Sequence, residues 1–519
     1  MDPPRVVTEE ERAKAKEYLE ESGLLGDVEA ALNEACRAHP RDLHGYLSTR
    51  LFEGCRPAVI DKWSAHEMVG PDGAPAVMVE LSAHFRGTTA VRGTATVPLT
   101  HPPAQPPAKG EEVVESFDGV DFMPLCSALT VGTAEMAVSD QANVDAVLQS
   151  AGRDLLAHSL VDAAVRAASV AALAAAAEVR QIPASAVFSE LAGVGKAAVP
   201  LPLITAVAME ASGGKCLMRG VWAGAPAGVT GRAAQLYLCR FHQALQAAAA
   251  KKAVSDGNPQ LIGGLVPPKM DSLGDALDLI KEASTAVSKA SPARVLIDVG
   301  ADRFWNDKKG KYELSKKDQK SPAEVVKELL GVAKSRPELI GFIDPLAAVH
   351  QTEIAEMVAT LAEGGQAVFS ADPRPETDTG DADGASDQKA DAAGDAAVPA
   401  DGDGGKGEEG EDEPGAVAAA VPGVGAVVYG ARARTVTELA ATVAAKAQAE
   451  RTVVFSAVDG DRLWPALAVD LAAGSGATYV HIGPLFGQGA ALCARLAAMD
   501  SVATAAADAV DAAAAGPAQ

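Results

Sequence analysis

The sequence is short of aromatic residues, of cysteines and of long apolar runs. Phe, Trp and Tyr make up 4% of the 519 residues, and the six cysteines are scattered with no CxxC pair. Scattered thiols of this kind fit a reducing compartment and give no zinc-binding motif. The most apolar stretch, residues 163–177, is rich in alanine and contains Arg166, which predicts a buried helix and not a membrane span.

Positive charge is scarce too, and the common nucleotide-binding motifs are missing. Lys and Arg number 45 against 69 Asp and Glu, a net charge of −24, so binding to nucleic acid is not expected. No phosphate-binding GxxxxGK[ST] loop occurs, and no GxGxxG follows a predicted strand. The first residues lack the apolar core of a secretory signal, so we expect a cytoplasmic protein without membrane attachment.

Apolar residues make up 48% of the sequence, enough for the two or three domains that this length predicts. The segment 372–414 stands apart, because it holds 15 acidic and 3 basic residues and so contributes −12 of the net charge. It has almost no large apolar side chains, which predicts a disordered insert. Its Asp-Gly repeats lack the glutamate that ends a calcium-binding loop, so a solvated spacer is favoured over a calcium site.

The N-terminal residues 1–57 predict a small helical module. His39-Pro40 interrupts its second helix, and Asp42 can cap the third. Apolar residues recur at helical spacing and are expected to form a docking interface: Leu24, Val28, Leu32, Leu43, Tyr46, Leu47 and Leu51. Short amphipathic helices bury little surface alone, so we expect this module to pair with a like module and to bind an amphipathic helix of a partner. The alternative is a helical extension that packs against its own chain.

Beyond this module the pattern changes from strands to helices and then to strand–helix units. Residues 76–81 and 91–97 alternate as strands about a turn at Arg86-Gly87, and residues 139–193 are helical. From residue 199 onward strands and helices alternate, which predicts a parallel sheet closed into a barrel of about eight units. After a first strand at 199–203, strands are expected at 295–299, 339–343, 366–370, 425–429, 452–456 and 478–483, with helices at 272–289, 321–335 and 353–363.

The barrel phrases resemble enolase. The segment 294–346 contains VLIDVGADRFW and ELIGFIDPL, which align with enolase phrases without gaps, and the likeness extends over about residues 58–505. The resemblance implies an α/β plus α+β fold class. It predicts an enolase-like α+β domain at 58–195 and a (β/α)8 TIM-type barrel at 196–505, followed by an alanine-rich tail at 506–519.

Most residues that the family uses to bind magnesium are replaced. In enolase an Asp, a Glu and a second Asp at the ends of barrel strands bind Mg²⁺, an ion that requires oxygen ligands. The resemblance places Asp298, Ile343 and Ala371 at these positions. Ile343 offers no oxygen, and Asp372 would restore the third ligand only after a shift of one residue. We therefore expect no complete metal site and no cofactor.

The positions for acid–base chemistry and substrate binding are replaced as well. The lysine that acts as the base in the family falls on Tyr429, and the proton-donating glutamate falls on Ile262. The substrate-binding positions fall on Cys216, Ala457, Val458 and His481. Losing both the metal ligands and the acid–base pair leaves little from which catalysis could be built. Asp298, Tyr429 and His481 are expected to have packing and hydrogen-bonding roles.

The phrase at residues 18–53 resembles the dimerisation/docking module of the DPY-30 and protein kinase A regulatory-subunit type. Such a module joined to a degenerate enolase frame resembles the divergent enolase-like proteins of sperm flagella and motile cilia. The resemblance implies a pseudoenzyme that is a structural part of the axoneme, a homo- or heterodimer bound to axonemal and cytoskeletal proteins. Two alternatives stay open: a weak Mg²⁺-dependent phosphopyruvate hydratase, which converts 2-phosphoglycerate to phosphoenolpyruvate, and a barrel that senses a small-molecule ligand.

Overall fold

The chain divides into two compact units, residues 1–68 with 76–183 and residues 69–75 with 184–519. The computed structural model describes residues 8–69, 75–98, 122–155, 158–195, 198–208, 216–252, 272–314, 318–371, 423–447, 452–459, 462–463, 467–485 and 488–514. Among the helices in these ranges, none has the length and apolar character needed to span a lipid bilayer. The predicted acidic insert, Ile262 and Asp372 lie outside the described residues.

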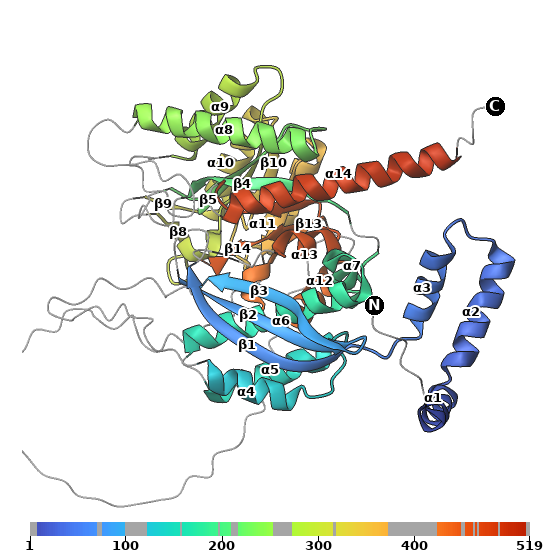
Figure 1. Ribbon diagram of the computed structural model, residues 1–519. Helices are drawn as coiled ribbons and strands as arrows, with labels where there is room; N and C mark the ends of the chain where they lie inside the picture. The colour runs from blue at the N-terminus through green and yellow to red at the C-terminus, as the bar shows by residue number, and fades with distance from the viewer. Residues whose placement is uncertain are drawn as a thin grey trace, which may run out of the picture. The chain divides into compact units, whose positions relative to one another are not determined.

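Three helices open the first unit: α1 (Glu9–Ser22), α2 (Leu24–Ala38) and α3 (Leu43–Glu53) (Figure 1). They lie where the sequence predicts them. His39 ends α2 in the left-handed region with φ 47°, directly before Pro40. The Asp42 carboxylate then caps α3, since its Oδ1 accepts a hydrogen bond from the amide of Gly45 at 2.9 Å.

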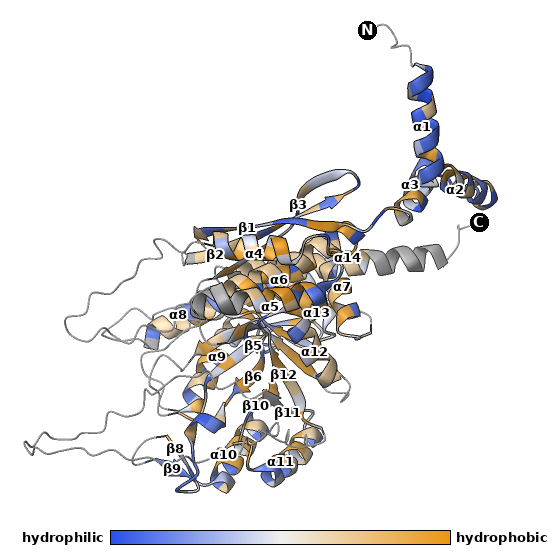
Figure 2. Cartoon of the chain, turned by 90° about the horizontal axis from the view of Figure 1, so that it is seen from below, coloured by the Kyte–Doolittle hydropathy of each residue, from blue (hydrophilic) through white to orange (hydrophobic). Residues whose placement is uncertain are grey.

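Most of the residues predicted to form a docking interface are not covered by this module. Ala31 and Ala35 of α2 are buried. The larger side chains are exposed or half-buried: Leu24, Leu32, Leu43 and Leu51 belong to the first group, and Val28, Tyr46 and Leu47 to the second. The helices therefore leave a set of apolar side chains accessible. Figure 2 shows that α1, in contrast, is largely hydrophilic.

A three-stranded sheet follows, in the order β1 (Val59–Val69), β2 (Pro75–Phe85), β3 (Thr88–Pro98). The two predicted strands are present and antiparallel, and the predicted turn at Arg86-Gly87 joins them, with positive φ at both residues. The sequence reading missed β1, because its apolar residues do not alternate over most of its length.

Three helices accompany this sheet: α4 (Met123–Gly132), α5 (Gln141–Leu155) and α6 (His158–Arg180). The alanine-rich part of α6 is buried, as predicted, and Arg166 is buried with it. Small side chains let α6 approach β3 closely, since a Cβ atom at Gly93 would lie 1.9 Å from the carbonyl oxygen of Ala171. The alanines thus serve close packing between a helix and a sheet.

The second unit is a closed barrel of eight strands, which confirms the predicted barrel (Figure 1). In chain order the strands are β4 (Leu201–Ala208), β5 (Gly220–Gly224), β6 (Arg294–Asp298), β10 (Leu339–Ile343), β11 (Ala367–Ala371), β12 (Gly425–Tyr429), β13 (Val453–Ser456) and β16 (Tyr479–His481). The helices are α7 (Ala184–Leu191), α8 (Gly231–Lys252), α9 (Leu273–Val287), α10 (Pro322–Ser335), α11 (Gln351–Glu363), α12 (Val436–Ala447), α13 (Ala468–Gly474) and α14 (Gln488–Ala514).

The barrel departs from the prediction at β5. This strand runs antiparallel to both of its neighbours, so the predicted all-parallel sheet is wrong here. The segment between Ala208 and Gly220 is short for a helical crossover, which takes about a dozen residues or more, so the chain returns in the opposite direction. As a result β5 begins at the barrel end where the parallel strands finish, and its first residue Gly220 pairs with Asp298, the last residue of β6.

Two small sheets were also not predicted. One consists of β7 (Trp305–Asn306), β8 (Lys311–Glu313) and β9 (Gln319–Lys320), and the other of β14 (Val458–Asp459) and β15 (Arg462–Leu463). Their strands have two or three residues each, too few for a periodic pattern to be recognised. The helix α14 continues to Ala514, so it includes part of the region that was expected to be an alanine-rich tail.

Candidate functional site at the barrel mouth

Seven of the predicted site residues that the structure describes lie at one end of the barrel. Each lies at the end of a barrel strand or within two residues after it: Asp298, Ile343, Ala371, Tyr429, Ala457, Val458 and His481. The pairing of Ile343 with Asp298 and of Ser456 with both Tyr429 and His481 shows that these strand ends are level with one another. We call this end the barrel mouth. In barrels of this type, the carboxyl ends of the strands carry the functional site.

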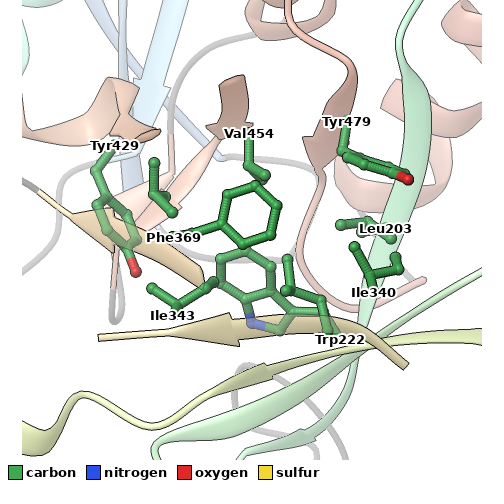
Figure 3. Close-up of a cluster of buried hydrophobic side chains, with 10 residues drawn as sticks. Leu203, Trp222, Ile340, Ile343, Phe369, Tyr429, Val454 and Tyr479 are labelled. Carbon is green, nitrogen blue, oxygen red and sulfur yellow. The ribbon is translucent and has the colours of Figure 1, made fainter. Parts of the chain in front are cut away.

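Ile343 belongs to the packed interior of the barrel. It is completely buried in a cluster of side chains that come from the barrel strands (Figure 3). The cluster consists of Leu203, Trp222, Leu296, Ile340, Ile343, Phe369, Val427, Tyr429, Val454 and Tyr479. An apolar side chain thus occupies the position at which the resemblance expects a glutamate ligand, and it contributes to the core.

Asp298 is buried and has a cationic neighbour. The Nε atom of Arg219 lies 3.9 Å from its Oδ2 atom, and the Tyr429 hydroxyl donates to the same oxygen at 3.4 Å. The guanidinium carbons of Arg432 and Arg219 lie 4.2 and 5.9 Å from the centre of the Tyr429 ring. Two arginines, a tyrosine and a carboxylate therefore form one group at the mouth, with opposite charges next to each other.

His481 is held as a neutral imidazole. Its Nδ1 atom lies 2.8 Å from the Ser456 hydroxyl and its Nε2 atom 2.8 Å from the Thr205 hydroxyl. Since Ser456 donates its own proton to the carbonyl of Val458, its oxygen accepts from Nδ1–H, and Nε2 is left to accept from Thr205. Burial, with the nearby Arg219 charge as a second cause, lowers the pKa of His481 to about 3.

Asp344, which sequence reasoning did not single out, follows Ile343 in an unusual backbone conformation. Its φ is 44°, and its Oδ1 atom accepts a hydrogen bond from the amide of Ala371 at 2.9 Å. Burial raises the pKa of Asp344 to about 7, and the nearby carboxylates of Asp298 and Asp302 raise it further, whereas the Ala371 hydrogen bond and Arg219 lower it.

Three further predicted positions, Cys216, Ala457 and Val458, hold buried side chains. Ala457 and Val458 are buried, and the Ala457 amide donates to the carbonyl of His481 at 2.8 Å. Burial raises the pKa of the Cys216 thiol to about 11, so it stays protonated at neutral pH. Sequence reasoning also missed Arg219 and Trp222, because neither stands in a recognisable motif.

The described residues do not fit a magnesium ion. Mg²⁺ needs several oxygen ligands in octahedral geometry. Within the described ranges, no group of three or more His, Cys, Asp or Glu side chains is placed to hold a metal ion. At the mouth, the Asp298 carboxylate is paired with Arg219, and Ile343 contributes no donor atom.

Two comparisons with known proteins agree with the shape of this barrel. Residues 225–342 match the family described as enolase, C-terminal TIM barrel domain. Over 337 residues, 59% of the chain, the sequence is 26% identical to cytosolic enolase 3 of Arabidopsis thaliana, and the match spans 64% of that protein's length. The closed eight-stranded barrel is consistent with this similarity to an enolase barrel domain, and the matched part spans less than two thirds of the Arabidopsis protein's length.

Proposed function

We propose that this chain is a catalytically degenerate, enolase-like protein that serves as a structural component of a ciliary or flagellar axoneme, in the central apparatus. The main observation in favour of lost catalysis is the complete burial of Ile343 in the barrel core. Ile343 has no oxygen atom to offer a metal ion, and its neighbours are packed tightly around it, so an ion could enter here only if the surrounding side chains moved.

The acid–base positions support the loss of catalysis. Tyr429, at the position of the base, donates its proton toward Asp298. Removing that proton would leave two negative charges about as far apart as a hydrogen bond, which is unfavourable in a buried site. His481 uses both ring nitrogens in hydrogen bonds to hydroxyl groups, so it is a structural residue.

The N-terminal helices support a role in assembly. The exposed leucines Leu24, Leu32, Leu43 and Leu51 lie on two short helices, which are joined by an ion pair between Glu34 and Arg50. Apolar side chains exposed in this way indicate a surface for another protein. In the proposal a like module covers part of this surface, and an amphipathic helix of an axonemal or cytoskeletal partner covers the rest.

One contact bears on the alternative that this module packs on its own chain. The Phe52 ring at the end of α3 meets the Phe85 ring edge-on at a centroid distance of 6.0 Å, and the Arg86 guanidinium lies 4.0 Å from the Phe52 ring centre. This contact involves the far end of α3 only. It leaves the leucines of α2 accessible, so anchoring of α3 and assembly through α2 are compatible.

The test measures turnover and assembly on the same full-length protein. With 2-phosphoglycerate and saturating Mg²⁺, we expect no formation of phosphoenolpyruvate, while an active enolase assayed in parallel confirms the conditions. A tagged chain is expected to cosediment with isolated axonemes and to lose this binding when the exposed leucines are changed. Turnover that disappears in Asp298→Asn would instead establish a weak hydratase. A shift of the melting temperature by a small organic acid would favour a ligand-sensing barrel.

A further inference from the structure

Arg219 brings a permanent positive charge into the barrel mouth. Its side chain is largely buried, with 12% of its surface exposed, and so is that of Asp298, with 5% exposed. A buried guanidinium is stable only beside a compensating charge and hydrogen-bond acceptors. Its position 3.9 Å from Asp298 Oδ2 provides the compensating charge.

The fold sets this position through the antiparallel strand β5. Arg219 directly precedes β5, and its backbone amide donates to the carbonyl of Asp298 at 2.7 Å. The side chain then passes Gly300, which has φ 56°, and a Cβ atom at Gly300 would lie 2.2 Å from Arg219 Cδ. A glycine is therefore required both by the backbone and by the space that the arginine occupies.

The charge of Arg219 acts on more than one group at the mouth. The guanidinium is close enough to Asp344 and His481 to influence both electrostatically, in addition to Asp298. Asp298 and Asp344 also influence each other. A cation beside two buried carboxyl groups has the charge sign that a bound metal ion would have.

We propose that Arg219 is the resident cation of the barrel mouth: its guanidinium neutralises Asp298 in the place where the fold family would hold a divalent metal ion. Because a guanidinium stays charged at all accessible pH values and is tethered to the chain, millimolar divalent ions do not displace it. The mouth is thus closed to metal ions by an ion pair as well as by the apolar packing of Ile343. This inference concerns ion binding and holds whether or not the chain is part of an axoneme.

The test uses the full-length chain and Mn²⁺ as the probe. The wild-type chain is expected to show no saturable Mn²⁺ binding by electron paramagnetic resonance of the free ion. The variant Arg219→Gln is expected to melt about 5–10 °C lower, because it removes the guanidinium that lies 3.9 Å from the buried Asp298 carboxylate. Adding Asp298→Asn to that variant is expected to recover most of the loss, because the uncompensated charge is removed.

Arg303→Gln is the matched control. Arg303 lies close to Asp298 in the sequence, and its guanidinium donates a hydrogen bond to the Met218 carbonyl at 2.9 Å. Combining Arg303→Gln with Asp298→Asn is expected to lower the melting temperature by the sum of the two single effects. Combining Arg219→Gln with Asp298→Asn is expected to lower it by less than that sum.

Two results would overturn the proposal: saturable Mn²⁺ binding by the wild-type chain that Asp298→Asn abolishes, or additive effects of Arg219→Gln and Asp298→Asn. If Arg219→Gln does not fold, the Mn²⁺ titrations of the wild-type chain and of Asp298→Asn decide the question. Turnover of 2-phosphoglycerate without Mn²⁺ binding at Asp298 would contradict the proposed function and leave this inference intact. Mn²⁺ binding at Asp298 without turnover would contradict the inference about Arg219 and leave the proposed function intact.

Discussion

The imidazole of His481 lies flat against the indole of Trp222, with ring centroids 3.8 Å apart and an interplanar angle of 5°. The same imidazole is hydrogen-bonded to Thr205 and to Ser456. These four residues lie on β16, β5, β4 and β13, so one neutral histidine connects four strands of the barrel. His481, which the resemblance places at a substrate-binding position, is a structural connection inside this barrel.

We predict that His481→Ala lowers the free energy of unfolding by about 2–4 kcal/mol. The substitution removes the stacked ring and leaves the hydroxyl groups of Thr205 and Ser456 buried without their present partner. Denaturant unfolding of the two proteins measures the difference. Thr205→Val is the control, since it removes one hydrogen bond but keeps the ring, and is expected to lose about 1–2 kcal/mol. Equal losses in both variants would contradict a role for the ring contact.

Asp344 predicts a dependence of stability on pH. Its pKa of about 7 in the folded chain lies above the unfolded value of 3.8, so the folded state holds a proton between these pH values and the unfolded state does not. The contribution of Asp344 to stability is therefore fully present below pH 3.8 and is lost as the pH rises toward 7. The slope of this loss is about 1.4 kcal/mol per pH unit.

Asp344→Asn tests this assignment. Asparagine tolerates the left-handed backbone and can still accept the hydrogen bond from Ala371, but it does not ionise. We expect the variant to gain stability relative to the wild type as the pH is raised from 5 to 8 in urea unfolding experiments. The buried His481 titrates in the opposite direction in both proteins, so it cancels in the difference. A difference that stays constant over this range would exclude Asp344 as the titrating group.

Restoring a carboxylate at the position of Ile343 is predicted to damage the fold. Ile343→Glu places a charge in a completely buried site next to Asp344 and close to Asp298, and we expect a loss of more than about 3 kcal/mol. Ile343→Val, which removes one methyl group and adds no charge, is the control, with a loss of about 1 kcal/mol. Both are measured by denaturant unfolding with and without Mg²⁺. Full stability of Ile343→Glu with added Mg²⁺ would show that the mouth can still hold a metal ion.

Leu32 tests the proposed assembly surface. It is exposed on α2, so Leu32→Asp is expected to leave the melting temperature nearly unchanged while it weakens self-association in sedimentation experiments. Val502→Asp provides a matched control, since Val502 is an exposed apolar residue on α14. A chain that is monomeric at micromolar concentration, or a dimer that Leu32→Asp does not affect, would contradict assembly through this module.

Much of the fold could be predicted because local patterns and short connections dictate it. The strands 339–343 and 425–429 were predicted with the bounds that the structure has, since each is a continuous apolar run bounded by turn residues. The resemblance predicted which residues would meet at the barrel mouth, since the carboxyl ends of strands in a barrel converge. The antiparallel direction of β5 could not be predicted from alternation alone, because an apolar strand of five residues carries no sign of its direction.

Local patterns in the sequence predict most of the long barrel strands and their closure into a barrel, whereas β1, β5 and the two small sheets carry no such signature. The contacts of the residues at the barrel mouth, in contrast, follow from the tertiary fold. Thr205 and His481 are 276 residues apart, and Arg219 meets Asp298 because β5 reverses direction, so neither contact has a local signature. Periodicity reports which side of an element is buried, whereas hydrogen bonds and ion pairs depend on side chains that the fold alone brings within a few ångströms of each other.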